Sequence, residues 1–279
     1  MEEATGRAPG SGEPHAVWDK KSSLAAFFLD TLALADVELR KLRRDPAELL
    51  TRAIQPALWL LVFGQVFARL KAIPTGSIDY LTFMAPGILA QSVLFIAIFY
   101  GISVIWERDL GILQKLLVSP APRTALVLGK ALSAGVRGLA QGVIIYLLAL
   151  MLRIHLDFSP WHVAGVVFFI VLGSALFSTF SLAIACLVKT RERFMGIGQV
   201  LTMPMFFASN AIYPIASMPD WVRFVAKVNP VSYQVDALRL LMVQGGQPVF
   251  GVGLDACVLL LIFTALVLIT ARLYPNVIT

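Results

Sequence analysis

The chain has 279 residues, of which 58% are hydrophobic and 14% charged, with a mean hydropathy of +0.80. Soluble domains carry about 25% charged residues, so this composition excludes a water-soluble globular protein and predicts an integral membrane protein. The net charge of +6 does not indicate nucleic-acid binding, because the basic residues flank apolar blocks instead of forming one basic face. Cys186 and Cys257 stand apart from any metal-binding spacing, so no zinc site is predicted.

The N-terminal region precedes the apolar blocks and divides into two parts. Residues 1–17 are rich in Gly, Pro, Glu and Ala without apolar periodicity, which predicts a disordered cytoplasmic tail. Residues 18–45 are predicted to form an amphipathic interfacial helix, since apolar residues recur every three or four positions from Leu24 to Leu42 and a basic cluster follows. A helix packed on a partner protein is the alternative. Pro46 ends this helix.

Residues 46–279 contain six apolar blocks that we interpret as membrane spans, with more polar stretches between them. We therefore predict an all-α fold with six transmembrane helices. Their approximate ranges are 53–68, 81–105, 124–150, 161–187, 196–216 and 255–272.

The distribution of basic residues predicts the topology of these spans. Sixteen of the 23 lysine and arginine residues fall on the side that holds both termini, six fall on the other side, and Arg137 lies inside a span. Because cytoplasmic loops carry the excess of basic residues, both termini are expected in the cytoplasm.

The loop after the second span combines charge with an apolar stripe. Leucines at 110, 113, 116 and 117 recur at helical spacing, and Ser119-Pro120 follows them. This pattern predicts a short cytoplasmic helix. An exposed apolar stripe on a short helix is typical of a segment that fills a groove in a partner subunit, although a loop resting on lipid has the same composition.

Two spans contain candidate residues for a transport path. Arg137 in the third span must face protein or water, because a charge exposed to lipid costs at least ~2.5 kcal/mol, and Gln141 lies one turn away on the same side. Arg137 lines a substrate path or ties the bundle together. The fifth span offers an adaptable apolar wall and a terminal amide, or is simply a kinked, well-packed helix. Its candidate residues are Met203, Met205, Phe206 and Asn210.

The segment after the fifth span, from about 215 to 254, mixes aromatic and charged residues. Two short helices broken at Asn229-Pro230 fit this pattern. The aromatic residues favour helices that re-enter the outer leaflet over a plain surface loop.

Two of these segments together resemble the ABC-2 type exporter permeases. One is the run from Glu107 through Pro120 to Lys130 with the apolar span behind it. The other lies between the fifth and sixth spans and reads Met218-Pro219-Asp220-Trp221, Asn229-Pro230-Val231-Ser232-Tyr233 and Asp236-Ala237-Leu238-Arg239. The similarity extends from the amphipathic helix to the last span, with the motifs in the expected order.

The resemblance implies a permease subunit of an ATP-binding cassette exporter in a bacterial inner membrane. It implies a second permease protomer, with a homodimer expected, and two ATP-hydrolysing subunits that hold ATP and magnesium. The chain itself is expected to bind no cofactor or metal and to have no catalytic residues, because it lacks the GxxxxGK[ST] loop that cradles phosphates. The residues expected to couple to the ATPase are Glu107, Arg108, Asp109, Gly111, Leu113, Leu116 and Leu117.

Two other classes of function remain as alternatives. An ion-coupled carrier usually places acidic residues or histidine in the middle of spans, whereas the acidic residues here fall at span ends or in loops. An intramembrane enzyme needs a motif such as HExxH or a Ser/His pair, and none is present. The apolar spans favour a hydrophobic or amphipathic cargo such as a drug, a lipid or a lipid-linked glycan.

Overall fold

The computed structural model of the protein describes residues 46–71, 73–110, 123–188 and 190–273. Every named element within these ranges is a helix, and an isolated bridge joins Leu156 to Val243. The predicted tail at 1–17 and the predicted amphipathic helix at 18–45 lie outside the described residues. The elements are α2 (Pro46–Leu58), η1 (Trp59–Gly64), α3 (Gln65–Leu70), α4 (Tyr80–Tyr100), α5 (Ile102–Asp109), α7 (Arg123–Met151), α8 (Pro160–Leu187), α9 (Arg191–Phe207), η2 (Ile215–Ser217), α10 (Asp220–Val228), α11 (Pro230–Met242) and α12 (Val252–Leu273).

Five stretches of helix in the described ranges are long and apolar enough to cross a membrane. They match the first, second, third, fourth and sixth predicted spans, so an all-helical, multi-pass membrane fold is confirmed. Their bounds are Ala53–Leu70, Tyr80–Asp109, Val127–Met151, Pro160–Leu187 and Val252–Leu273.

The helix at the fifth predicted span is shorter than expected. The prediction ran from 196 to 216, but α9 ends at Phe207 after 17 residues, which at 1.5 Å per residue gives about 26 Å. The hydroxyl of Ser209 donates to the carbonyl of Phe206 at 2.6 Å and accepts the N–H of Ala211 at 3.3 Å. Because a serine side chain that bonds to nearby backbone competes with helical hydrogen bonds, the helix does not continue to Pro214.

The first membrane span begins at Ala53, as predicted, and the helix that contains it starts further upstream. α2, η1 and α3 run without a break from Pro46 to Leu70, and proline is well suited to the first turn of a helix. The central segment, Trp59–Gly64, is a π-helix that follows Pro56 closely. The span continues to Leu70, beyond the predicted end at 68, and so gains the length that the predicted range lacked.

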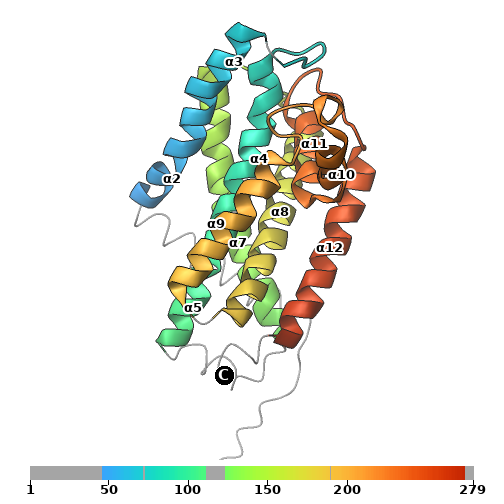
Figure 1. Cartoon of the computed structure of the whole chain (residues 1–279). Coiled ribbons are helices and arrows are strands. Elements are labelled where there is room, and N and C mark those ends of the chain that lie inside the picture. Colours follow the sequence, from blue (N-terminus) through green and yellow to red (C-terminus); the bar gives the residue numbers. More distant parts are fainter. Residues whose placement is uncertain (1–45, 72, 111–122, 189, 274–279) are drawn as a thin grey trace, which may run out of the picture.

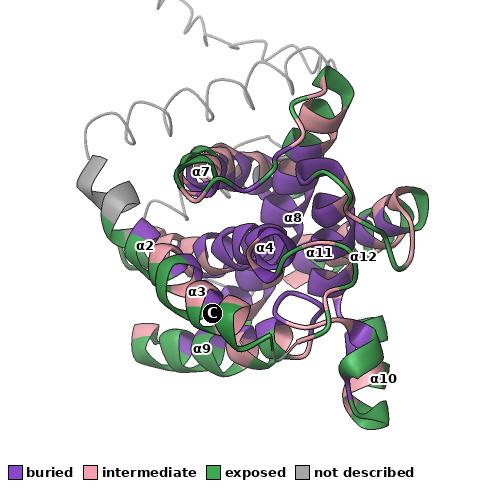
Figure 2. Cartoon of the chain, turned by 90° about the horizontal axis from the view of Figure 1, so that it is seen from above, coloured by how far each residue is buried: buried purple, intermediate pink, exposed green. Residues whose placement is uncertain are grey.

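α4 occupies the centre of the bundle. All but two of its residues from Tyr80 to Ile98 are buried, and Figure 2 shows it surrounded by the first helix, α7, α8 and α11. A helix that is apolar on all sides is stable only where other helices cover it. α7 packs against α8 through small residues, since a Cβ added to Gly138 would collide with the hydroxyl of Ser174.

The bundle has two ends (Figure 1). One end, here called the α5 end, holds α5, the first turns of α7 and α9, and the last turn of α12. The opposite α11 end holds α3, α10 and α11. The chain forms two helices on either side of Asn229 here, as the Asn229-Pro230 break predicts, while their placement in the outer leaflet stays a prediction.

Candidate functional site

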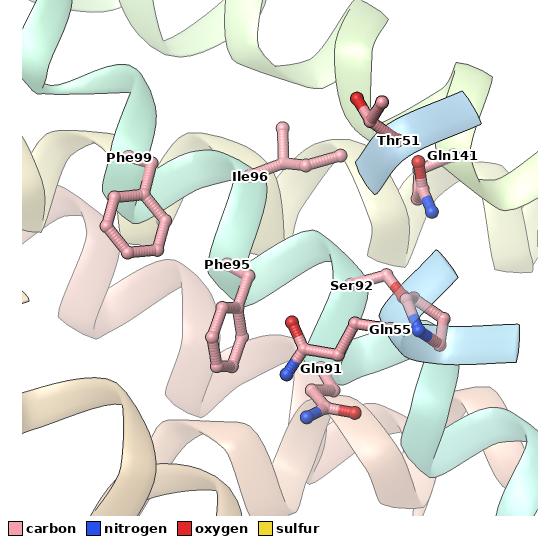
Figure 3. Close-up of a pocket in the computed structure, with 9 residues that line it drawn as sticks. Thr51, Gln55, Gln91, Ser92, Phe95, Ile96, Phe99 and Gln141 are labelled. Carbon is pink, nitrogen blue, oxygen red and sulfur yellow. The ribbon is translucent and has the colours of Figure 1, made fainter. Parts of the chain in front are cut away.

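A cavity of about 210 Å³ lies between α2, α4 and α7. We call it the glutamine cavity, because one glutamine from each helix reaches it (Figure 3). Aromatic and aliphatic side chains of α4 form the rest of the wall toward the α5 end. Its lining residues are Thr51, Gln55, Pro56, Gln91, Ser92, Phe95, Ile96, Phe99 and Gln141.

Two glutamines of this cavity are buried with incomplete hydrogen bonding. Gln141 is fully buried and Gln91 is 2% exposed. Both amide atoms of Gln141 and the Oε1 atom of Gln91 have no hydrogen-bond partner in the described part of the chain. Ser92 differs, because its hydroxyl donates to the carbonyl of Ile88 at 2.8 Å. A buried polar atom without a partner costs about 1–3 kcal/mol, so the cavity holds amide groups that are poised to bind.

A second cavity of about 350 Å³ adjoins the first. We call it the arginine cavity, because Arg137 lines it. The two cavities share Ile96 and Phe99, so together they follow α4 from Gln91 to the first residues of α5. The arginine cavity is lined by Ile96, Phe99, Tyr100, Ile102, Ser103, Trp106, Glu107 and Arg137.

The structure places the two predicted residues of the third span on neighbouring cavities. Gln141 lines the glutamine cavity and Arg137 lines the arginine cavity. The guanidinium of Arg137 lies 5.2 Å from the centroid of the Tyr100 ring, within the range of a cation–π interaction. The one-turn spacing in the sequence therefore corresponds to two polar residues of α7 that line adjoining cavities beside α4.

The four predicted residues of the fifth span do not line either of these cavities. Phe206 is fully buried, with its ring centroid 5.9 Å from that of Trp59, and Met203 and Met205 are half-buried. Asn210 is buried beside a third cavity of about 250 Å³ at the α11 end. The structure therefore separates these four residues from Arg137 and Gln141.

Asn210 lies next to a buried arginine. The guanidinium of Arg239 donates to the carbonyl of Asn210 at 2.6 Å and to that of Phe83 at 3.3 Å. Its Cζ atom also lies 3.8 Å from the centroid of the Phe83 ring. Arg239 thus ties α11 to α4 and to the chain that follows α9.

Three of the predicted coupling residues belong to α5, and neighbouring helices hold two of them, Glu107 and Asp109. Lys130 of α7 donates to Glu107 at 2.5 Å. Arg191 of α9 donates to Asp109 at 2.8 Å, and its guanidinium carbon lies 3.5 Å from the centroid of the Trp106 ring. Arg108 pairs with its neighbour Asp109 at 3.1 Å. The other four predicted coupling residues, Gly111, Leu113, Leu116 and Leu117, lie outside the described residues.

Sequence reasoning did not single out Gln55, Gln91 or Thr51. One signal for Gln91 was available, because it is an uncharged polar residue in the middle of an otherwise apolar span. Gln55 gave the same kind of signal near the start of the first predicted span, 53–68, whereas Thr51 precedes that span.

Together, the apolar helices and internal cavities define a multi-pass membrane protein with a hollow along its central helix. Residues 30–243 match the family described as ABC-2 type transporter, and the chain belongs to this family. It is therefore the membrane subunit, or permease, of an ABC transporter.

Individual relatives agree with this assignment. The chain is 30% identical over 231 residues to the ycf38 protein of Cyanophora paradoxa, which is named as a transport permease, covering 80% of this chain and 78% of that protein. It is 26% identical over 231 residues to the daunorubicin resistance ABC transporter permease protein DrrB1 of Streptomyces coeruleorubidus, covering 83% and 81%. It is 23% identical over 210 residues to nodulation protein J of Rhizobium meliloti strain 1021, covering 75% and 78%.

Proposed function

We propose that this permease exports a hydrophobic or amphipathic substrate, such as a drug, a lipid or a lipid-linked glycan, across a bacterial inner membrane. The observation that carries the proposal is the pair of adjoining cavities along α4. They lead from the middle of the bundle to Glu107 of α5, next to the segment expected to engage the ATPase. Mixed apolar and polar walls suit a cargo with both kinds of surface.

A separate ATP-binding cassette subunit supplies the energy in this proposal. That subunit holds ATP and magnesium, since the sequence of this chain contains no phosphate-binding loop. The contacts of Glu107 with Lys130 and of Asp109 with Arg191 join α5 to α7 and α9. A partner that moves residues 107–117 therefore acts on two membrane helices, and such a bias between two arrangements is what a transport cycle requires.

A second permease protomer and membrane lipids complete the proposed assembly, with both chain termini in the cytoplasm. Large apolar side chains are exposed on several membrane helices, among them Phe63 of the first helix, Leu147 of α7, Val200 of α9 and Leu261 of α12. Such side chains need lipid or protein cover. We propose that a second copy of this chain covers part of this surface.

Co-purification tests the proposed partnership. The chain is extracted in mild detergent and should bring a soluble P-loop ATPase in about equal amounts. Replacing Leu113 and Leu116 by Asp should abolish substrate-stimulated ATP hydrolysis, because charge in the apolar stripe prevents docking in a groove. The matched control replaces both residues by Met, which keeps the stripe apolar. If substrate still stimulates ATP hydrolysis in the Asp variant, the coupling role proposed for this segment is wrong.

One observation favours an ion-coupled carrier as the second candidate. Asp255, in the first turn of α12, is fully buried, and neither of its carboxylate oxygens has a hydrogen-bond partner within the described ranges. Carriers use buried carboxylates of this kind to hold ions or protons. Transport by vesicles that contain ATP and a proton ionophore separates the candidates, since an ATP-driven exporter keeps its transport and a proton-coupled carrier loses it.

A further inference from the structure

We infer that the glutamine cavity binds the uncharged, hydrogen-bonding part of an amphipathic cargo, and this inference rests on the proposed export function. Gln91 and Gln141 reach the cavity from α4 and α7 with buried amide atoms that lack partners in the described part of the chain. Gln55 of α2 adds a third amide to the same wall. Three amides from three helices that meet at one cavity form a built polar site.

The convergence of these amides distinguishes them from glutamines that hold the fold together. The Nε2 atom of Gln234 donates to the carbonyl of Phe169 at 3.4 Å, and that of Gln244 donates to the carbonyl of Leu156 at 3.1 Å. Gln141 has no such contact through either atom. A leucine would fill the position of Gln141 without the cost of an unpaired amide, so packing alone does not account for a glutamine there.

The charge of the wall selects an uncharged group. None of the nine lining residues carries a charge, and the charged Glu107 and Arg137 line the arginine cavity instead. A charged ligand group taken from water into a site without a counter-charge loses its hydration with no compensation. An amide offers both donors and acceptors, so its best complement is a group with both, such as a carboxamide or a hydroxyl.

The remaining wall selects an apolar body. Phe95 and Phe99 lie on the α4 side of the cavity in Figure 3, with Ile96 between them in the sequence. Aromatic side chains bind flat apolar groups through their faces and edges. The ligand class is therefore a neutral amphipathic molecule with a hydrogen-bonding head near the glutamines and an apolar part along α4.

A series of ligands with one ring system and different head groups tests this inference. The probes are 1-naphthaleneacetamide, which is neutral, 1-naphthaleneacetate, which is an anion, and 1-naphthylmethylammonium, which is a cation. Binding to the full chain in lipid nanodiscs is measured by equilibrium dialysis, and uptake by empty nanodiscs is subtracted. The amide should bind at least about tenfold more tightly than either ion, which corresponds to about 1.4 kcal/mol.

Variants of the lining glutamines locate the binding. Gln91→Leu and Gln141→Leu should each weaken binding of 1-naphthaleneacetamide about tenfold, through the loss of one or two hydrogen bonds. The control, Gln199→Leu, changes an exposed glutamine of α9 that does not line the cavity, and should bind normally. Gln55→Glu keeps the size of a more exposed wall residue and should shift the preference toward the cation, which tests the site even where a leucine variant does not fold.

The results of these experiments distinguish failure of the inferred binding site from failure of the proposed export function. Equal affinity for all three probes, or unchanged amide binding in both leucine variants and an unchanged preference in Gln55→Glu, overturns the inference. If the ATPase still co-purifies in that case, the proposed function stands without this site. If the amide binds as expected but no ATPase is ever recovered, the cavity stands and the proposed function fails.

Discussion

Three buried polar side chains at the α11 end are hydrogen-bonded differently from the two buried glutamines of the glutamine cavity, although Asn210 at the α11 end also has amide atoms without partners in the described residues. At the α11 end, Asn229, Asp236 and Arg239 each bond to backbone groups of another segment. At the cavity, Gln91 and Gln141 keep amide atoms without partners in the part of the chain that the structure describes. Both regions bury polar groups at similar depth, so burial alone does not indicate what a polar residue does. The partners of its atoms separate structural groups from groups available to a ligand.

Asp236 shows the structural case most fully. Its carboxylate accepts the N–H groups of Val249 and Phe250 at 2.8 Å, together with that of Gly251 at 3.4 Å. These residues lead into α12, whose first N–H groups have no partner within the helix. A carboxylate at a helix N-terminus is also favoured by the helix dipole. Asp236 therefore anchors the start of the last membrane helix to α11.

The largest effect in this comparison is expected at Asp236. Asp236→Ala leaves the N–H groups of Val249 and Phe250 without their carboxylate acceptor and should lower the free energy of unfolding by about 3 kcal/mol. The melting temperature of the detergent-solubilised protein measures this loss. Asp236→Asn keeps one acceptor oxygen, so its melting temperature should lie between those of the wild type and the alanine variant. An unchanged melting temperature in the alanine variant would show that the comparison does not hold at the α11 end.

At the glutamine cavity, we expect substitutions to leave the free energy of unfolding unchanged or to raise it, in contrast to Asp236→Ala. Gln91→Leu and Gln141→Leu remove unpaired amides, so each should leave the melting temperature unchanged or raise the free energy of unfolding by up to about 1 kcal/mol. Gln234→Leu is the matched control, because this buried glutamine donates to the carbonyl of Phe169 and its loss should destabilise the protein. A loss of stability at Gln91 or Gln141 as large as that at Gln234 would assign the cavity glutamines a structural role.

The smallest effect is expected at the exposed loop between α7 and α8. The N–H of Ser159 and the ring of His162 bond to the Asp157 carboxylate and lower its pKa. Because the folded pKa is lowered, this stabilisation is present above the unfolded pKa of about 3.9 and is lost as the pH falls through the folded value. The melting temperature of wild type should therefore exceed that of Asp157→Asn at pH 7, and the two should converge below pH ~4. A constant difference across this range would contradict the assignment.

The sequence predicted most of the membrane helices because hydropathy is a local property. The blocks at 124–150 and 161–187 differ from α7 and α8 by one residue at each end, or by none. The end of α9 was missed, since it depends on the turn made by Ser209. The first span starts at Ala53 as predicted, while the turns of α2 before it contain polar residues such as Thr51, which lines the cavity.

The candidate site was predictable only where one helix contributes both residues. Helical spacing places Arg137 and Gln141 on one side of α7, and the structure finds them on adjoining cavities. Which face of α4 meets α7, and hence the role of Gln91, depends on packing between helices that are distant in sequence. Asn210 was grouped with the path by its position near a span end, whereas the chain turns after α9 and carries it toward Arg239.

α9 is attached to other helices at both of its ends. At the α5 end, Arg191 grips Asp109 and Trp106. At its other end, the amide of Asn229 donates to the carbonyls of Met205 and Ala208 at 2.6 and 3.1 Å, while its Oδ1 accepts the N–H of Val231 in α11. Figure 1 shows α9 running between these attachments. A helix resists compression along its axis. Through its contacts at both ends, α9 therefore links α5 mechanically to α11 at the opposite end of the bundle.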